Sequence, residues 1–113
     1  MFNEEFRSML QEAIDAGNRE NTEVVPERLA VLCWVYDELA ELLECEPKLV
    51  MRPAFILGSV CAKTSEISLN REQFMQMKKV LDKCDTVDIW PLTDGSVSFD
   101  VTVRGVFKGI TNR

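Results

Sequence analysis

The sequence predicts an α+β domain in which three helices pack on one face of a small antiparallel sheet and the chain ends in a C-terminal β-hairpin. Three segments repeat apolar residues at helical spacing, and the C-terminal third alternates apolar with polar residues as a half-buried strand does. With 113 residues, 46% hydrophobic and 28% charged, the chain has the size and composition of a single domain spanning residues 1–113.

The first two helices are expected over residues 2–16 and 24–45. Gly17 and Asn18 form a stop signal for the first helix, and Pro26 suits the first turn of the second, where its missing N–H is not needed. The second helix contains the run LAVLCWVY, which is apolar on every side. We therefore expect it to be the central core helix or part of an oligomer interface. The apolar stripe of the first helix comprises Phe2, Phe6, Met9, Leu10, Ala13 and Ile14.

A third helix is expected over residues 70–84. Asn70 is a good N-cap, and Gln73 completes a capping-box pattern three residues later. Leu69 and Phe74 occupy the two positions of a hydrophobic staple. The expected buried stripe comprises Phe74, Met77, Leu81 and Cys84.

Residues 49–69 are open to two interpretations. The run LVMRPAFILGSVCA can contain a buried strand with a bulge at Gly58, followed by a second strand at ISL after the KTSE turn. It can instead contain a short helix that begins at Pro53, because periodicity does not separate a short buried strand from a short helix. We favour the strands.

Residues 86–110 read as a hairpin and its continuation. Apolar and polar residues alternate strictly from Val97 to Arg104. A two-residue loop would place Ile89 on the face opposite the valines, whereas a three-residue loop over residues 93–95, with Gly95 left-handed, keeps the apolar residues on one face. We choose the three-residue loop, which pairs Ile89 with Phe99 and Val87 with Val101.

The same register sets Asp88 opposite Asp100 and Trp90 opposite Ser98 on the outer face. Facing residues have Cβ atoms roughly 4.5–5.5 Å apart, where like charges are unfavourable. A bound cation, a basic group of a partner or a raised pKa on one acid can relieve the repulsion, and so can a neighbouring lysine or water. Two carboxylates beside an exposed Trp also suit acid–base chemistry on a sugar. Asp88, Trp90 and Asp100 are therefore our candidate ligand or cation site.

Charge is unevenly distributed along the chain. Residues 1–47 hold twelve acids and three bases, whereas residues 48–113 hold seven acids and ten bases. In the second helix the acids follow helical spacing, so they share one face that can attract a basic partner or simply be solvated. This acidic face comprises Asp37, Glu38, Glu41 and Glu44.

Several function classes are excluded by composition. The chain has no histidine, which removes His-based catalytic triads and His-ligated metal sites. Its four cysteines are never spaced as C-x-x-C, so we expect reduced, buried thiols and a cytoplasmic protein. The sequence pI of about 4.7 argues against nucleic acid, no glycine-rich phosphate loop is present, and no apolar run is long enough for a membrane span. We expect no metal and no cofactor.

The function that the sequence favours is a non-enzymatic protein-binding module that presents an acidic helical surface. A basic protein partner and a homodimer are both expected, because the apolar stripes of two helices exceed what one small sheet covers. The alternative is a small carboxylate-dependent enzyme or cation-binding protein that uses Asp88 and Asp100 beside Trp90.

Overall fold

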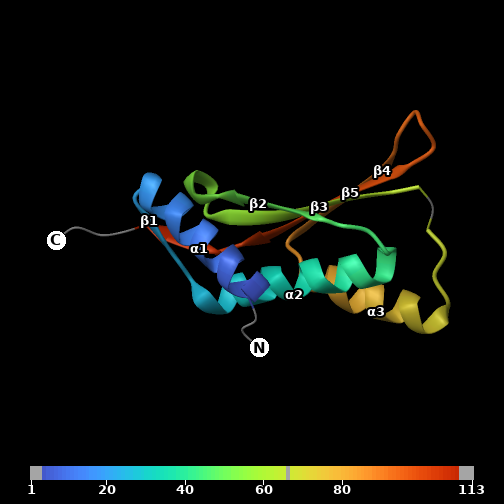
Figure 1. Ribbon diagram of the computed structural model, residues 1–113. Coiled ribbons are helices and arrows are strands. Elements are labelled where there is room, and N and C mark those ends of the chain that lie inside the picture. The colour runs from blue at the N-terminus through green and yellow to red at the C-terminus, as the bar shows by residue number, and fades with distance from the viewer. Residues whose placement is uncertain (1–3, 66, 110–113) are drawn as a thin grey trace.

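The computed structural model describes residues 4–65 and 67–109, whose arrangement is shown in Figure 1. Phe2 and Ile110, which the predicted first helix and final segment include, lie outside these residues. In chain order the elements are α1 (Glu4–Arg19), β1 (Thr22–Val24), α2 (Pro26–Leu43), β2 (Lys48–Arg52), the 3₁₀ helix η1 (Pro53–Phe55), β3 (Leu57–Thr64), α3 (Arg71–Asp82), β4 (Thr86–Pro91), β5 (Val97–Arg104) and β6 (Phe107–Gly109).

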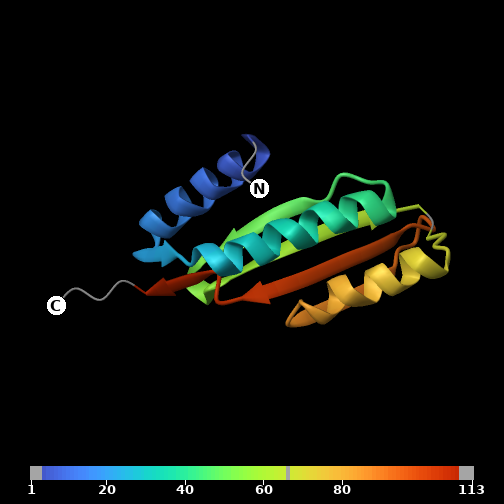
Figure 2. The same cartoon turned by 90° about the horizontal axis from the view of Figure 1, so that it is seen from below.

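Four strands form an antiparallel sheet in the order β2-β3-β5-β4. α2 and α3 lie side by side along one face of this sheet, and α1 lies on the same side, next to α2 (Figures 1 and 2). β1 and β6 form a separate two-stranded antiparallel sheet. The predicted α+β fold is confirmed. Its hairpin consists of β4 and β5, after which β6 pairs with β1.

The core is built around α2, as the all-round apolar run predicts. Leu29, Leu32, Val35 and Leu39 are fully buried, and they share one core cluster with the inward-facing residues of β3 and β5. Gly58 of β3 lets α2 approach the sheet closely, because a Cβ at that position would lie 2.5 Å from Cδ2 of Leu32. The bulge expected at Gly58 is wrong, since this residue sits in regular register with both neighbouring strands. Its missing side chain serves packing instead.

α1 does not stop at Gly17 and Asn18 but continues to Arg19. Gly17 is buried against β1, where an added Cβ would lie 3.0 Å from the carbonyl oxygen of Thr22. Thr22 Oγ1 also donates a hydrogen bond to the carbonyl of Gly17 at 3.3 Å. Glycine is therefore present because the backbone of β1 packs against the helix, and the left-handed residue that follows the helix is Asn21, with φ of 55°.

Within residues 49–69 each interpretation is right in part: the run from Leu49 contains strands, two where one was expected, and a short helix does begin at Pro53. β2 and β3 pair as a hairpin, and a three-residue 3₁₀ helix beginning at Pro53 makes the turn between them. The predicted strand at ISL, residues 67–69, is wrong, because this segment has no strand pairing and leads into α3. The strand signal came from short apolar composition alone, which tertiary context overrides.

α3 begins with the predicted capping box. Asn70 Oδ1 accepts a hydrogen bond from Gln73 N at 2.8 Å, and Asn70 N donates to Gln73 Oε1 at 2.9 Å. The predicted burial of Phe74 is wrong, since its side chain is 56% exposed. Of the other predicted residues Met77 is buried and Leu81 and Cys84 are partly buried, and Val80 takes the place of Phe74 in the buried face.

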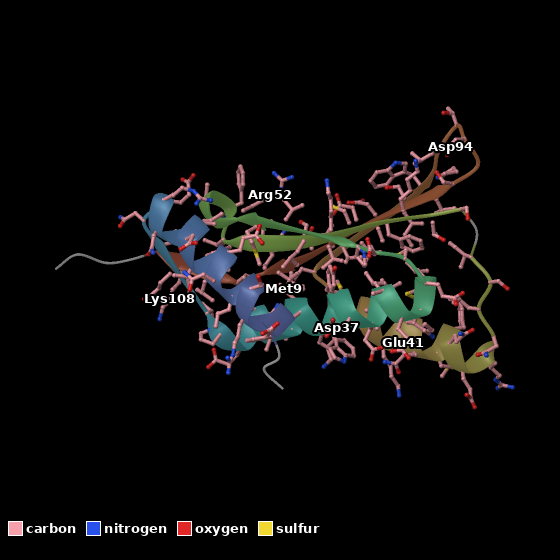
Figure 3. The ribbon with its side chains drawn as sticks, viewed as in Figure 1. Met9, Asp37, Glu41, Arg52, Asp94 and Lys108 are labelled. Carbon is pink, nitrogen blue, oxygen red and sulfur yellow. The ribbon has the colours of Figure 1, made fainter. Side chains whose placement is uncertain are left out.

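The β4–β5 hairpin has the predicted register and loop. Ile89 pairs with Phe99, Leu92 N donates to Ser96 O at 2.8 Å, and Gly95 takes φ of 88°. Asp94, labelled at the tip of the hairpin in Figure 3, accepts hydrogen bonds from the backbone N and the hydroxyl of Ser96. These bonds, followed by Lys63 at 3.1 Å, lower the pKa of Asp94 well below its ordinary range.

One polar cluster fastens the start of α2 to the end of the sheet. Asp85 Oδ2 accepts a hydrogen bond from Arg104 N at 2.7 Å and lies 3.4 Å from Nη2 of Arg28. Nε of Arg28 donates to the carbonyl oxygen of Arg104 at 3.0 Å. The first turn of α2, the segment before β4 and the end of β5 therefore share one set of hydrogen bonds.

The close contact between α2 and the sheet can be measured with a double-mutant cycle. Leu32→Ala should lower the free energy of unfolding by about 2–5 kcal/mol, as for a buried leucine. Gly58→Ala should cost about 1–3 kcal/mol, because the new Cβ overlaps Leu32. In the Leu32→Ala background the same glycine change should cost less than about 0.5 kcal/mol, because the methyl enters vacated space. Urea unfolding of the four proteins gives the coupling.

Gly109→Ala is the matched control, because no atom lies within 4 Å of the added Cβ there. It should change stability little and should add to Leu32→Ala without coupling. Strictly additive costs for Leu32 and Gly58 would show that α2 does not press against the sheet at this point.

Candidate functional site

A line of exposed side chains follows the outer surface of α2, on the side turned away from the sheet. Its members are spaced by three or four residues, as one face of a helix requires. We call this line the α2 strip; it comprises Glu27, Ala30, Trp34, Asp37, Glu41 and Glu44. The strip includes three of the four acids predicted for the acidic face.

The second half of the strip is acidic. Asp37, Glu41 and Glu44 are exposed, and none of them forms an ion pair with another described residue. Figure 3 shows Asp37 and Glu41 on the outer side of the helix. Glu38, the fourth predicted member, is half-buried and accepts a hydrogen bond from Gln76 Nε2 of α3 at 3.0 Å. Glu38 therefore serves the contact between the helices and is not part of the free acidic surface.

Two of these acids, Glu41 and Glu44, stand at the unfavourable end of their helix, whereas Asp37 lies nearer its middle. The carbonyl end of a helix carries partial negative charge, so an acid there costs about 0.3–1 kcal/mol where a base would stabilise. α2 has no basic residue in its last turn, and Glu44 caps it. The negative charge at the end of α2 therefore does not stabilise α2 itself.

The first half of the strip consists of Glu27 and the apolar residues Ala30 and Trp34, and it borders two hollows. A hollow of about 400 Å³ separates α1 from α2 and is lined by Phe6, Leu10, Pro26, Glu27 and Ala30. A second hollow, of about 300 Å³, lies on the α3 side and is lined by Ala30, Val31, Trp34 and Lys83. Trp34 is 36% exposed here. The sequence analysis missed this surface, although the spacing of the strip residues could have indicated that Trp34 continues the acidic line.

α1 is held beside α2 by a sulfur contact. Cys33 Sγ lies 3.6 Å from Met9 Sδ, and Met9 is labelled on the α2 side of α1 in Figure 3. Burial, and next the nearby carboxylate of Asp37, raise the pKa of the Cys33 thiol to about 11. The thiol is therefore protonated at neutral pH and acts as a packing group. All four cysteines are free, and burial raises the pKa of each.

The other candidate site lies on the sheet face that no described helix covers. Asp88 and Asp100 are directly opposed, as predicted, and Trp90 faces Ser98. Oδ1 of Asp100 is buried without a hydrogen-bond partner among the described residues. Neither acid is paired with a described lysine or arginine, so the relief that the facing charges need is not supplied by a salt bridge.

Cys61 of β3 stands beside the acid pair, on the other side of Asp100. Burial is the main cause that raises the pKa of Cys61, and the charge of Asp100 and a hydrogen bond with it add to the rise. Arg52 and Lys48 act in the opposite direction. Within residues 4–65 and 67–109, no three His, Cys, Asp or Glu side chains come together in a way that could hold a metal ion.

Comparison with models of protein families, with curated proteins and with solved structures gives no match to this chain. None of the helices in the described part of the chain is long and apolar enough to cross a membrane.

The state of the acid pair can be tested by neutralising one member. Asp100→Asn should raise the free energy of unfolding by up to about 1 kcal/mol, because it removes a like-charge cross-strand pair. Asp85→Asn is the matched control and should lower it, because Asp85 is bonded to Arg28 and Arg104. Thermal melts with and without millimolar Ca²⁺ or Mg²⁺ check both. A cation site would be established instead if the cation raised the melting temperature of the unmodified protein but not that of Asp100→Asn.

The raised thiol pKa values predict a pH effect on stability. In the unfolded chain the thiols of Cys33 and Cys84 ionise at their ordinary pKa of 9.0, whereas folding holds both at about 11. The unfolded state then binds fewer protons, so stability should fall as pH rises from 9 to 11. The fall should be shallower in the Cys33→Ala, Cys84→Ala variant, measured by urea unfolding across that range. Equal slopes would mean that the two thiols are not protected by burial.

Proposed function

We propose that the protein is a non-enzymatic protein-binding module that self-associates and uses the α2 strip as its binding surface. The observation that carries this proposal is the set of three unpaired carboxylates, Asp37, Glu41 and Glu44, on the same helix face as Trp34, which lines an apolar hollow. The carboxylates of Glu41 and Glu44 lie where the helix dipole disfavours them. A basic partner surface would turn this unfavourable arrangement into a favourable one.

The composition of the surface supports protein binding over catalysis. Protein interfaces combine an apolar centre with a polar, charged rim, and aromatic residues are enriched at the centre. Trp34 lines the hollow on the α3 side, and the acids continue from it along the same helix. Trp is one of the residues that most often dominate binding energy when a partner covers them.

The competing proposal is a cation site or carboxylate-dependent enzyme at Asp88 and Asp100. The buried, unpartnered Oδ1 of Asp100 favours it. Two observations weigh against it: among the described residues Asp88, Asp100 and the neighbouring Cys61 do not come together in a way that could hold a metal ion, and the hollows described above do not include the pair. We therefore place protein binding first.

Charge-neutral variants test the binding surface. The protein carrying Asp37→Asn, Glu41→Gln and Glu44→Gln should lose proteins that the unmodified protein captures at low salt, because each carboxylate is a contact for a basic group. Affinity capture with quantitative identification of the bound proteins measures the loss.

The matched control carries Glu4→Gln, Glu12→Gln and Glu20→Gln, which removes the same number of charges from exposed positions in and just after α1. It should capture what the unmodified protein captures. If both variants keep or both lose the same proteins, the α2 strip is not the binding surface and net charge alone governs the capture.

A further inference from the structure

We propose that the basic surface recognised by the α2 strip is α3 of a second copy of this chain, in a two-fold dimer whose helical layers face each other. This inference rests on the proposed function and names its partner. Two features carry it: α2 and α3 bear opposite charge, and they lie side by side on the same outer surface (Figure 2).

The two helices are electrostatic complements. Residues 26–44 hold five acids and one base, and that base, Arg28, is already bonded to Asp85. Residues 71–83 hold four bases and two acids. The bases of α3 and its C-cap form no ion pair with described acids of α2, so both helices have charge to offer to another surface; these bases are Arg71, Lys78, Lys79 and Lys83.

The helices run antiparallel, which fixes how two copies can meet. Gln76, in the first half of α3, contacts Glu38 in the second half of α2, and Lys83 at the end of α3 lines the hollow beside Trp34. A two-fold axis parallel to the helices and midway between the layers exchanges α2 with α3 while keeping positions along the helices. Each α2 strip then lies over the α3 of the other copy, and both contacts are identical.

This axis puts complementary groups at the same level. The half of α3 around Gln76, which carries Arg71, Glu72 and Lys78 and is net basic, lies over the acids Asp37 and Glu41. Lys83 comes to the level of Trp34, where a lysine over an aromatic face is attractive. The exposed side chain of Met75, in the same part of α3, supplies apolar cover.

The other two-fold arrangement fails on charge. An axis perpendicular to the helices lays each α2 antiparallel over the α2 of the other copy. With the axis at Trp34, Glu41 meets Glu27, and the remaining acids face a helix whose base is already bonded. Like charges placed opposite each other cost affinity. The pattern of charge therefore selects the exchanged pairing of α2 with α3.

The size of the contact sets the conditions for observing it. α2 is about 27 Å long at 1.5 Å per residue, and two adjacent helices about 10 Å wide give a footprint of about 500 Å² per copy. A standard stable interface buries about 800 Å² per partner. The dimer is therefore weak, and because charge holds it, added salt should dissociate it.

Sedimentation equilibrium at low ionic strength and high micromolar concentration should give a mass approaching twice the 12.9 kDa of the chain. Half-molar salt should return the single-chain mass. The variant with Asp37→Lys and Glu41→Lys should be monomeric, and so should the variant with Lys78→Glu and Lys79→Glu. An equimolar mixture of the two should recover dimers, because each supplies the charge that the other has lost. Thermal melts of the separate variants establish that both are folded.

The reversal Glu4→Lys, Glu12→Lys on α1 is the control and should leave the dimer intact. The inference is overturned if the unmodified protein stays at 12.9 kDa under all conditions, if the α2 reversal still dimerises, or if the mixture stays monomeric. A different pair of results is a monomeric unmodified protein together with a charge-neutral strip variant that still loses captured proteins. That pair of results would overturn this dimer but leave the binding of other proteins by the α2 strip in place. If one reversal fails to fold, the milder pair Asp37→Asn, Glu41→Gln should weaken dimerisation in its stead.

Discussion

The close approach of α2 to the sheet is the constraint on which the other features depend. Leu32 fills the space that Gly58 leaves open, so the helix lies deep enough for the sheet to cover one side of it. α1 and α3 then cover its two flanks through Met9 and Gln76. A helix enclosed on three sides keeps one exposed line, and Trp34, Asp37 and Glu41 lie on it, whereas Glu38 is directed to α3.

The same enclosure separates the roles of chemically similar residues. Glu38 and Glu41 are three positions apart on one helix, yet Glu38 is bonded to α3 and Glu41 has no partner among the described residues. Cys33 has a strongly raised pKa because it lies between α1 and α2, which leaves it unreactive at neutral pH. Residue type alone therefore does not decide which of these groups can act at the surface.

The sequence predicted the features that local rules govern. The hairpin register with Gly95 and the capping box at Asn70 follow from turn chemistry and alternation, and with the register came the opposed pair Asp88 and Asp100. Gly17 was misread because its role is set by a strand that packs against it. The apolar hollows, the antiparallel contact of α2 with α3 and the uncovered sheet face arise only from tertiary packing, so no pattern within one segment could predict them.

The pairing of β1 with β6 has a consequence for the order of folding. It joins residues 22–24 to residues 107–109, the longest sequence separation of any strand pair described here. Closing so long a loop has a high entropic cost that is recovered only after the intervening sheet has formed. α1 packs against β1, so α1 reaches its final position only after this late step. The hollow between α1 and α2 is therefore completed after the core, and in a newly made chain it forms only once residues 107–109 have been synthesised and paired.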